Sequence, residues 1–217
     1  MLSVFKIIME KKIKNPDWGY LNRYKDENAK ITSLSFEEKR IVFFGDSITA
    51  GWETHDPEFF ASKKLINRGI NGQTTSQMML RFRPDVIELK PASVIILAGT
   101  NDIAGNTGPT TLKTILGNLI SMCELAKAND INPILCSVLP AFDYPWRKGI
   151  LPAEKISNLN FMIKKYAAAN NIVYVDYHSA MADEQNGMKS IYSEDGVHPN
   201  EHGYLIMKSI LKSVISM

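Results

Sequence analysis

The sequence has few cysteines and no long apolar run, and both absences narrow the class of protein. Its 217 residues include two cysteines, Cys123 and Cys136, and neither belongs to a CxxC pair. Zinc-binding and dithiol chemistry are therefore disfavoured. We expect two buried free thiols, with a disulfide between them as the alternative. No stretch reaches the ~20 apolar residues that a helix needs to cross a bilayer, so no membrane span is expected.

An excess of charge of one sign is also missing. The 25 basic and 23 acidic residues give a formal net charge of +2, which is too balanced to indicate nucleic acid as a partner. Hydrophobic residues make up 45% of the chain and charged residues 22%, as in ordinary soluble globular proteins. The length suits one domain that spans residues 1–217.

The N-terminus lacks the charge order of a secretory signal peptide. In MLSVFKIIMEKK the lysines follow the apolar patch instead of preceding it, and no small-residue cleavage site is present. We therefore predict a cytoplasmic protein, with an exported form that lacks its signal peptide as the alternative. Residues 1–36 are interpreted as a peripheral N-terminal segment, with a helix over residues 11–36.

Five short runs of aliphatic, β-branched and aromatic residues predict strands, at residues 40–45, 65–69, 92–99, 132–138 and 171–176. Helical patterns lie between them. One helix is expected to begin at Asp56-Pro57 and another at Thr75, with Pro84 starting a further turn. Apolar repeats predict three more helices, after Thr110 and over residues 156–166 and 205–214. This alternation predicts the α/β class: a three-layer α/β/α sandwich around a five-stranded, mainly parallel, flavodoxin-like sheet.

Reactive side chains follow several of the predicted strands, where such sheets bind their ligands. Ser47 follows the first strand, at a turn into a helix that would expose its hydroxyl and aim backbone amides at negative charge. His198 comes three residues after Asp195, so one turn can bring the carboxylate to the imidazole. Taken alone, Ser47 reads as a helix N-cap and DGVHP as a surface turn. Together they supply the hydroxyl, imidazole and carboxylate of a serine hydrolase.

Gly72 in NGQT and Asn101 in GTND are candidates for an oxyanion hole. A glycine lets its amide approach a substrate closely, and an asparagine side chain donates a neutral hydrogen bond. Both stretches are also common turn sequences. Their placement after the second and third predicted strands is what favours a functional role.

As a set, these segments resemble the SGNH hydrolases, the GDSL-type esterases and lipases that include bacterial acylhydrolases and platelet-activating-factor acetylhydrolase-like proteins. The resemblance runs from about Arg40 to the end of the chain, through GDSI, NRGINGQTT, GTND and DGVHP. The first motif reads GDSI in place of GDSL, a mild change between similar apolar residues. Thr49 breaks the GxSxG elbow that marks the α/β-hydrolases.

The resemblance implies a role for each of these residues. Ser47 would attack an ester carbonyl, His198 would act as general base and then acid, and Asp195 would orient His198. The amides of Ser47 and Gly72 and the side chain of Asn101 would hold the oxyanion. No metal or organic cofactor is implied. Asp46 and Asp102 are expected to brace their loops, and His178, at a strand end, is the second choice for the base.

The stretch AFDYPWRKGILP, residues 141–152, follows the fourth strand and is rich in aromatic residues. It is interpreted either as a surface loop or as a wall of the substrate pocket, because aromatic rings suit sugar faces. Similar PWR-type segments in acylhydrolases favour the pocket. The candidate substrate-binding residues are Asp46, Tyr144, Trp146 and Arg147.

The function predicted from these residues is hydrolysis of small carboxylic esters, with O-acetyl groups on carbohydrates as the first substrate. Short-chain acyl esters and lipid esters of the lysophospholipid or platelet-activating-factor type are the alternatives. The expected partner is a small-molecule ester, and a homo-oligomer is left open.

Two other classes of function compete with this prediction. A metallophosphoesterase could use Asp46, Asp102, Asp195 and His198 as ligands, but it would need more histidines at strand ends than the four scattered ones here. A non-catalytic binding protein on the same fold is the other.

Overall fold

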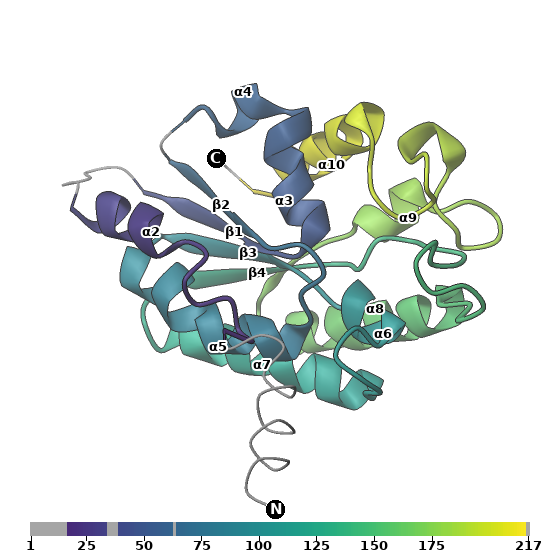
Figure 1. Ribbon diagram of the computed structural model, residues 1–217, viewed down its shortest axis with the longest axis horizontal. Helices are drawn as coiled ribbons and strands as arrows, with labels where there is room; N and C mark the ends of the chain where they lie inside the picture. Colours follow the sequence, from purple (N-terminus) through teal and green to yellow (C-terminus); the bar gives the residue numbers. More distant parts are fainter. Residues whose placement is uncertain (1–16, 34–38, 63, 216–217) are drawn as a thin grey trace, which may run out of the picture.

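The computed structural model of the chain describes residues 17–33, 39–62 and 64–215. Its five strands form a parallel sheet in the order β2-β1-β3-β4-β5 (Figure 1). Each strand lies within two residues, at either end, of its predicted position. The predicted α/β fold is confirmed. The strands are β1 (Ile41–Gly45), β2 (Leu65–Gly69), β3 (Ser93–Leu97), β4 (Asn132–Cys136) and β5 (Val173–Val175).

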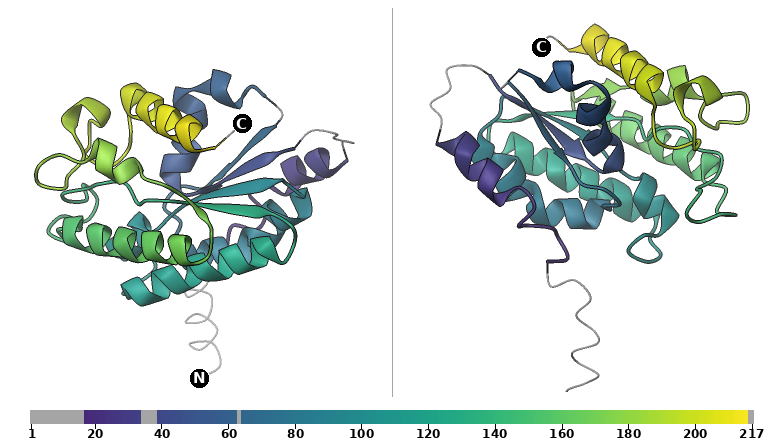
Figure 2. Two further views of the ribbon diagram at one scale, coloured as in Figure 1. Left: turned by 180° about the vertical axis from the view of Figure 1, so that it is seen from behind. Right: turned by 45° about the horizontal axis from the view of Figure 1, so that its top comes forward.

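Helices cover both faces of the sheet, which gives the three predicted layers (Figures 1 and 2). One face carries α5 (Thr75–Asp85), α7 (Leu112–Lys127) and α8 (Ala153–Ala169). The opposite face carries α3 (Ser47–His55), α4 (Pro57–Phe60), α9 (Tyr177–Met181) and α10 (Glu201–Val214). The short helix α6 (Thr100–Ala104) follows β3, and a 3-10 turn, η2 (Ser190–Tyr192), precedes α10. Helix α2 (Lys25–Thr32) packs against α5 and a second 3-10 turn, η1 (Ile87–Leu89).

Successive residues of each strand enter different cores. Val42 and Phe44 of β1 belong to the core on the side of α5, α7 and α8. Ile41 and Phe43 belong to the core on the side of α3 and α10. Burial of both faces explains why the strands read as unbroken apolar runs, and each fully buried large apolar side chain contributes roughly 1.5–3 kcal/mol.

Local signals set most of the helix boundaries. Asp56 caps α4 by accepting a hydrogen bond from the amide of Phe59, and Pro57 is the first helical residue, as predicted. The prediction for Pro84 was wrong: it lies inside the last turn of α5 and begins no new turn. The helix ends one residue later, and the missing proline amide costs it one i→i−4 hydrogen bond.

Only part of the predicted N-terminal helix falls within the described residues. Within the predicted range 11–36, the structure has turns up to Tyr24 and then α2, Lys25–Thr32. The remainder of that prediction, and the charge pattern of residues 1–12, lie outside the described residues. Cys123 and Cys136 are buried free thiols, as expected.

The strand order places the candidate site. The chain runs from β1 outward to β2, then crosses to β3 on the other side of β1, so the crevice beyond β1 and β3 is a topological switch point. Gly45 ends β1 at this crevice. A Cβ at this position would collide with the side chain of Thr49 and lie 2.7 Å from the carbonyl oxygen of Leu97. The glycine therefore allows β1 and α3 to meet closely at the edge where Ser47 follows.

Candidate active site

Ser47 is the first residue of α3, directly beyond the carboxyl end of β1. The bare amides of this helix start point toward the crevice and carry a partial positive charge. The N-cap is Asp46, whose Oδ1 accepts a hydrogen bond of 3.0 Å from the amide of Ile48. Ser47 is thus free of the capping role that is the ordinary explanation of a serine at this place.

Ser47, His198 and Asp195 form one hydrogen-bonded chain. The Oγ of Ser47 lies 3.0 Å from Nε2 of His198, and Nδ1 of His198 lies 2.7 Å from Oδ2 of Asp195. An ionised carboxylate only accepts hydrogen bonds, so Nδ1 carries the ring proton and Nε2 is left to accept from the hydroxyl. The two segments lie 151 residues apart in the sequence.

The turn that holds Asp195 favours its ionised form. Its Oδ1 accepts hydrogen bonds from the amides of Val197 (2.9 Å) and His198 (2.7 Å) and from the hydroxyl of Ser193 (3.1 Å). Burial by itself would raise the pKa of Asp195. The hydrogen bonds from the ring and amide of His198 and from the Val197 amide outweigh burial, and the pKa lies below its ordinary value.

The two other oxyanion candidates belong to a second polar cluster around Asn106. The amide nitrogen of Asn101 donates to Oδ2 of Asp46 at 3.2 Å, which places it beside Ser47. Asn106 donates to Oδ1 of Asn101 at 2.8 Å and to the carbonyl oxygen of Gly72 at 3.1 Å. Gly72 has a φ of 75°, a conformation that favours glycine. The structure therefore brings the predicted Gly72 and Asn101 together.

Sequence reasoning missed Asn106. It lies in the turn after α6 and is exposed, and a polar residue in such a turn is ordinary. Its importance depends on two contacts with residues 34 and 40 positions away, Gly72 and Trp146. No spacing pattern in the sequence signals such contacts.

Asp46 and Asp102 are buried carboxyls that brace the crevice, as expected. Asp102 accepts from the amide (2.9 Å) and the hydroxyl (2.6 Å) of Thr75, at the start of α5. Burial raises the pKa of Asp46 to about 7, against the opposing hydrogen bond from Ile48. Burial also raises the pKa of Asp102 to about 6, against the bonds from Thr75.

The loop 141–152 borders the site through Trp146. Its ring lies 5.9 Å from that of His198, and its Nε1 donates to Oδ1 of Asn106 at 3.3 Å. Tyr144 lies beneath Trp146, fully buried, with its hydroxyl 2.9 Å from that of Thr100. Trp146 is 44% exposed, so of these two aromatic rings it is the one that a substrate can reach.

Arg147 faces α6 and not the cleft. Its Nη1 donates to the carbonyl oxygens of Ala104 (2.7 Å) and Gly105 (2.8 Å). These carbonyls lie at the carboxyl end of α6, where a cation is favourable. Of the four predicted substrate-binding residues, Asp46, Tyr144 and Arg147 hold the framework, and Trp146 borders the site.

The other histidines lie apart from this chain of contacts. His55 ends α3 and stacks on Tyr204, with 5.2 Å between the ring centres. His178 is in α9, and its backbone amide donates to the hydroxyl of Ser137. Burial lowers the pKa of His178, because it disfavours the charged ring. His202 is in the first turn of α10.

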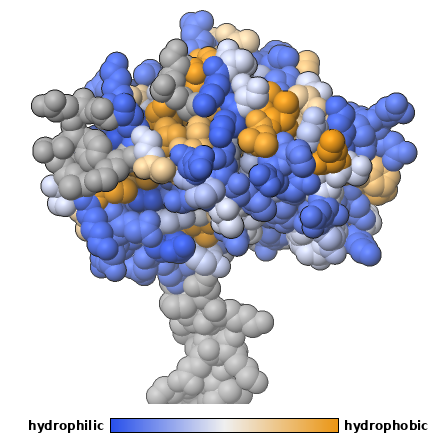
Figure 3. Space-filling model, turned by 90° about the horizontal axis from the view of Figure 1, so that it is seen from above, coloured by the Kyte–Doolittle hydropathy of each residue, from blue (hydrophilic) through white to orange (hydrophobic). Residues whose placement is uncertain are grey.

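A cleft of about 1210 Å³ begins at Ser47 and His198 and runs along α3 and the edge strand β2. Its far walls include Tyr20, Arg23 and Glu53, so charged and aromatic groups line it together. The upper face of the molecule carries separate apolar patches among hydrophilic side chains (Figure 3). Within the described ranges, no group of three or more His, Cys, Asp or Glu side chains is placed to hold a metal ion.

The fold is a three-layer α/β/α sandwich, and the carboxyl edge of its parallel sheet brings a hydroxyl, an imidazole and a carboxylate into one hydrogen-bonded chain. A serine hydrolase needs this arrangement. The chain belongs to the GDSL-like lipase/acylhydrolase family, whose sequence model matches residues 43–206. This family of ester hydrolases is part of the SGNH hydrolase superfamily. The resemblance seen in the sequence is confirmed.

Solved and curated relatives agree with this membership. A GDSL-like lipase from Bacteroides thetaiotaomicron VPI-5482 is 48% identical with a TM-score of 0.87, over 90% of this chain and 97% of that one. A proposed acylhydrolase from Bacteroides fragilis NCTC 9343 is 46% identical with a TM-score of 0.86, over 93% and 100%. The uncharacterized lipoprotein YqeF of Bacillus subtilis (strain 168) is 34% identical over an alignment of 120 residues, and the match covers 48% of this chain. The chain matches about half of that relative, 49% of its length.

Proposed function

We propose that this protein is a serine esterase that hydrolyses small carboxylic esters, with Ser47 as nucleophile, His198 as base and Asp195 as its orienting acid. The observation that carries the proposal is the continuous chain from Ser47 Oγ through His198 to Asp195, at 3.0 and 2.7 Å. Both distances are within hydrogen-bonding range, which is the geometry that proton transfer from a nucleophile requires.

In the acylation step, Ser47 Oγ forms a bond to the ester carbonyl carbon while its proton passes to Nε2 of His198. The carbonyl electron pair moves onto oxygen and gives a tetrahedral oxyanion. The carbon–oxygen bond to the alcohol then breaks, and the leaving alkoxide takes the proton from Nε2. Ser47 retains the acyl group.

In the deacylation step, water takes the place of the alcohol. It gives its proton to His198 Nε2 as its oxygen bonds to the acyl carbon, and Ser47 leaves with that proton. In both steps the oxyanion is held by the amides of Ser47 and Gly72 and by the second amide hydrogen of Asn101. The first hydrogen of Asn101 is directed to Asp46. Loss of one such donor typically lowers turnover by roughly 10²–10³.

The preferred substrates are O-acetyl esters of carbohydrates. Support comes from the mixed polar and aromatic lining of the cleft, including Tyr20, Arg23 and Glu53, and from Trp146 beside His198, because sugars present both hydroxyls and flat apolar faces. The alternatives are short-chain acyl esters and lipid esters of the lysophospholipid or platelet-activating-factor type. They would use the same chemistry.

A series of p-nitrophenyl esters of rising chain length, assayed beside acetylated oligosaccharides, tests the proposal. We expect the acetyl esters to give the highest kcat/KM. Ser47→Ala is expected to lower kcat by at least about 10³-fold, because the nucleophile is lost. Ser157→Ala is a matched control, since within the described part of the chain its hydroxyl bonds only to Ala153 of α8. A preference for long chains would contradict the substrate, and full activity of Ser47→Ala would contradict the mechanism.

The other predictions on partners and compartment are not decided by the site. That the protein binds no nucleic acid and that it lies in the cytoplasm stay predictions, as does the possible homo-oligomer. In the described part of the chain, no helix is long and apolar enough to cross a membrane. The lipoprotein among the relatives supports the alternative of an exported form. The competing classes are a metallophosphoesterase and a non-catalytic binding protein. Ester hydrolysis that a chelator does not inhibit would argue against the first, and its loss in Ser47→Ala would argue against the second.

A further inference from the structure

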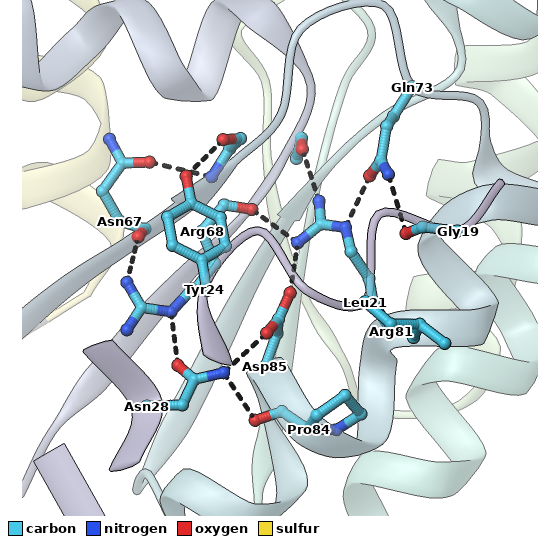
Figure 4. A network of polar contacts seen from close by, with 12 residues as sticks. Gly19, Leu21, Tyr24, Asn28, Asn67, Arg68, Gln73, Arg81, Pro84 and Asp85 are labelled. Carbon is cyan, nitrogen blue, oxygen red and sulfur yellow. Dashed lines mark hydrogen bonds and ion pairs between the residues drawn. The ribbon is translucent and has the colours of Figure 1, made fainter. Parts of the chain in front are cut away.

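The segment Asp17–Thr32 precedes the residues matched by the family model, 43–206, yet it bonds directly to the loop that carries Gly72. That loop joins β2 to α5 through residues 70–74. Figure 4 shows the network, in which side chains from the N-terminal segment meet buried polar groups of β2 and α5. The placement of the Gly72 loop therefore depends on a part of the chain outside the matched region.

Tyr24 holds the residue at which the loop begins. Its side chain is buried, and its hydroxyl donates a hydrogen bond of 2.5 Å to the carbonyl oxygen of Gly69, the last residue of β2. The guanidinium of Arg68 lies over the Tyr24 ring, with Cζ 4.4 Å from its centre. Gly69 is three residues before Gly72, so a shift at this carbonyl carries directly into the loop.

Two glutamines hold the other end of the loop to the same segment. Gln73, the residue after Gly72, is fully buried and donates to the carbonyl oxygen of Gly19 at 3.2 Å. Gln77 donates to the carbonyl oxygen of Trp18 at 2.9 Å and accepts from the amide of Thr74. The segment thus contacts the chain on both sides of Gly72.

Asn28 extends these contacts to β1, the strand that precedes Ser47. It accepts from Nε of Arg68 at 2.9 Å and donates to Oδ1 of Asp85 at 2.7 Å. The other oxygen of Asp85 pairs with Arg81, which is fully buried and donates to the carbonyl oxygens of Arg68 and Gly45, both at 2.9 Å. Gly45 is two residues before Ser47. The buried guanidinium of Arg81 therefore links the carboxyl ends of β1 and β2.

We propose that the segment Asp17–Thr32 is a positioning element for the oxyanion hole, with Tyr24 as its main positioning residue. This rests on the proposed function, in which the Gly72 amide holds the oxyanion. Tyr24 also belongs to the lining of the cleft, but its hydroxyl bonds to Gly69, and its effect on the oxyanion passes through that residue. Misplacement of a transition-state donor by a fraction of an ångström weakens its bond to the oxyanion and lowers kcat, while the resting substrate is bound as before.

Tyr24→Phe tests this role because it removes only the hydroxyl. Steady-state kinetics with p-nitrophenyl acetate are expected to show kcat lowered about tenfold, with KM unchanged within about twofold. Hydrogen–deuterium exchange is expected to be faster at the amides of residues 70–75. Asn28→Ala should act in the same direction, and it is a second variant should the first fold poorly. Ser33→Ala is the matched control, because Ser33 lies outside this segment and, among the described residues, its hydroxyl bonds to the carbonyl oxygen of Lys30 and to nothing in the loop.

The two readouts separate this proposal from the proposed function. Unchanged exchange at residues 70–75 in both variants would overturn the positioning role whether or not the protein is an esterase. Faster exchange with unchanged kcat would overturn it as well, because the loop would move without affecting the oxyanion. A wild-type protein without esterase activity would contradict the proposed function, and the exchange data would still judge whether the segment orders the loop.

Discussion

Asn106 orients two groups of the candidate site with one side-chain amide. Its nitrogen donates to Oδ1 of Asn101 and to the carbonyl oxygen of Gly72, and its oxygen accepts from Trp146. The bond to Oδ1 fixes which end of Asn101 faces Asp46, since an amide oxygen cannot donate. The asparagine is thereby held with its nitrogen on the side of Ser47.

We predict that Asn106→Ala lowers kcat of ester hydrolysis by about tenfold, less than the loss of a donor that touches the oxyanion. The physical reason is that Asn101 and Gly72 lose a shared partner but keep their own donors. Steady-state kinetics with p-nitrophenyl acetate measure the effect. Asn129→Ala is the control, since its exposed side chain bonds, among the residues that the structure describes, only to Leu125 in α7. Equal kcat in the two variants would show that Asn106 does not orient the site.

The start of α3 combines a helix cap with a buried carboxyl. Asp46 caps the helix, accepts from Asn101 and is 1% exposed. Its pKa, 3.8 in an exposed aspartate, is raised to about 7 by burial. At pH values between 3.8 and about 7, Asp46 holds more of its proton in the folded protein than in the unfolded chain. The free energy of unfolding therefore falls as the pH rises through this range. Asp102, with its pKa raised by burial to about 6, contributes with the same sign.

Asp46→Asn removes the larger of these two contributions while keeping an oxygen for the Ile48 amide. We predict that the free energy of unfolding of this variant falls less steeply than that of the wild type from about pH 4 to about pH 7. Urea denaturation across this range measures the slope. Asp26→Asn, on the exposed side of α2, should leave the wild-type slope intact. Identical slopes for Asp46→Asn and wild type would mean that folding does not change the pKa of Asp46, and would contradict this prediction.

At the scale of the whole molecule, the sheet explains why much of this structure could be read from the sequence. Buried parallel strands are continuous apolar runs, and their order gathers the loops after β1, β2 and β3 at one edge. Ser47, Gly72 and Asn101 could therefore be placed together from the sequence, whereas the Asp195–His198 turn follows none of these strands and is joined to them by the motif set as a whole.

What could not be predicted are contacts that depend on side-chain direction. Tyr144 and Trp146 are two residues apart, yet one is fully buried and the other borders the site. Arg147 turns back to the end of α6, and Asn106 and Tyr24 bond to residues far away in the chain. Such contacts follow from the packing of several elements, which no local pattern encodes.

The central claim is that Ser47 is a nucleophile activated by His198, and covalent labelling tests it most directly. A fluorophosphonate probe, followed by peptide mass spectrometry, should find one phosphonylated residue, Ser47. In His198→Ala the labelling rate should fall by at least about 100-fold, because the general base is lost. A wild-type protein that hydrolyses esters while Ser47 stays unlabelled, or a His198→Ala variant labelled at the wild-type rate, would contradict the account.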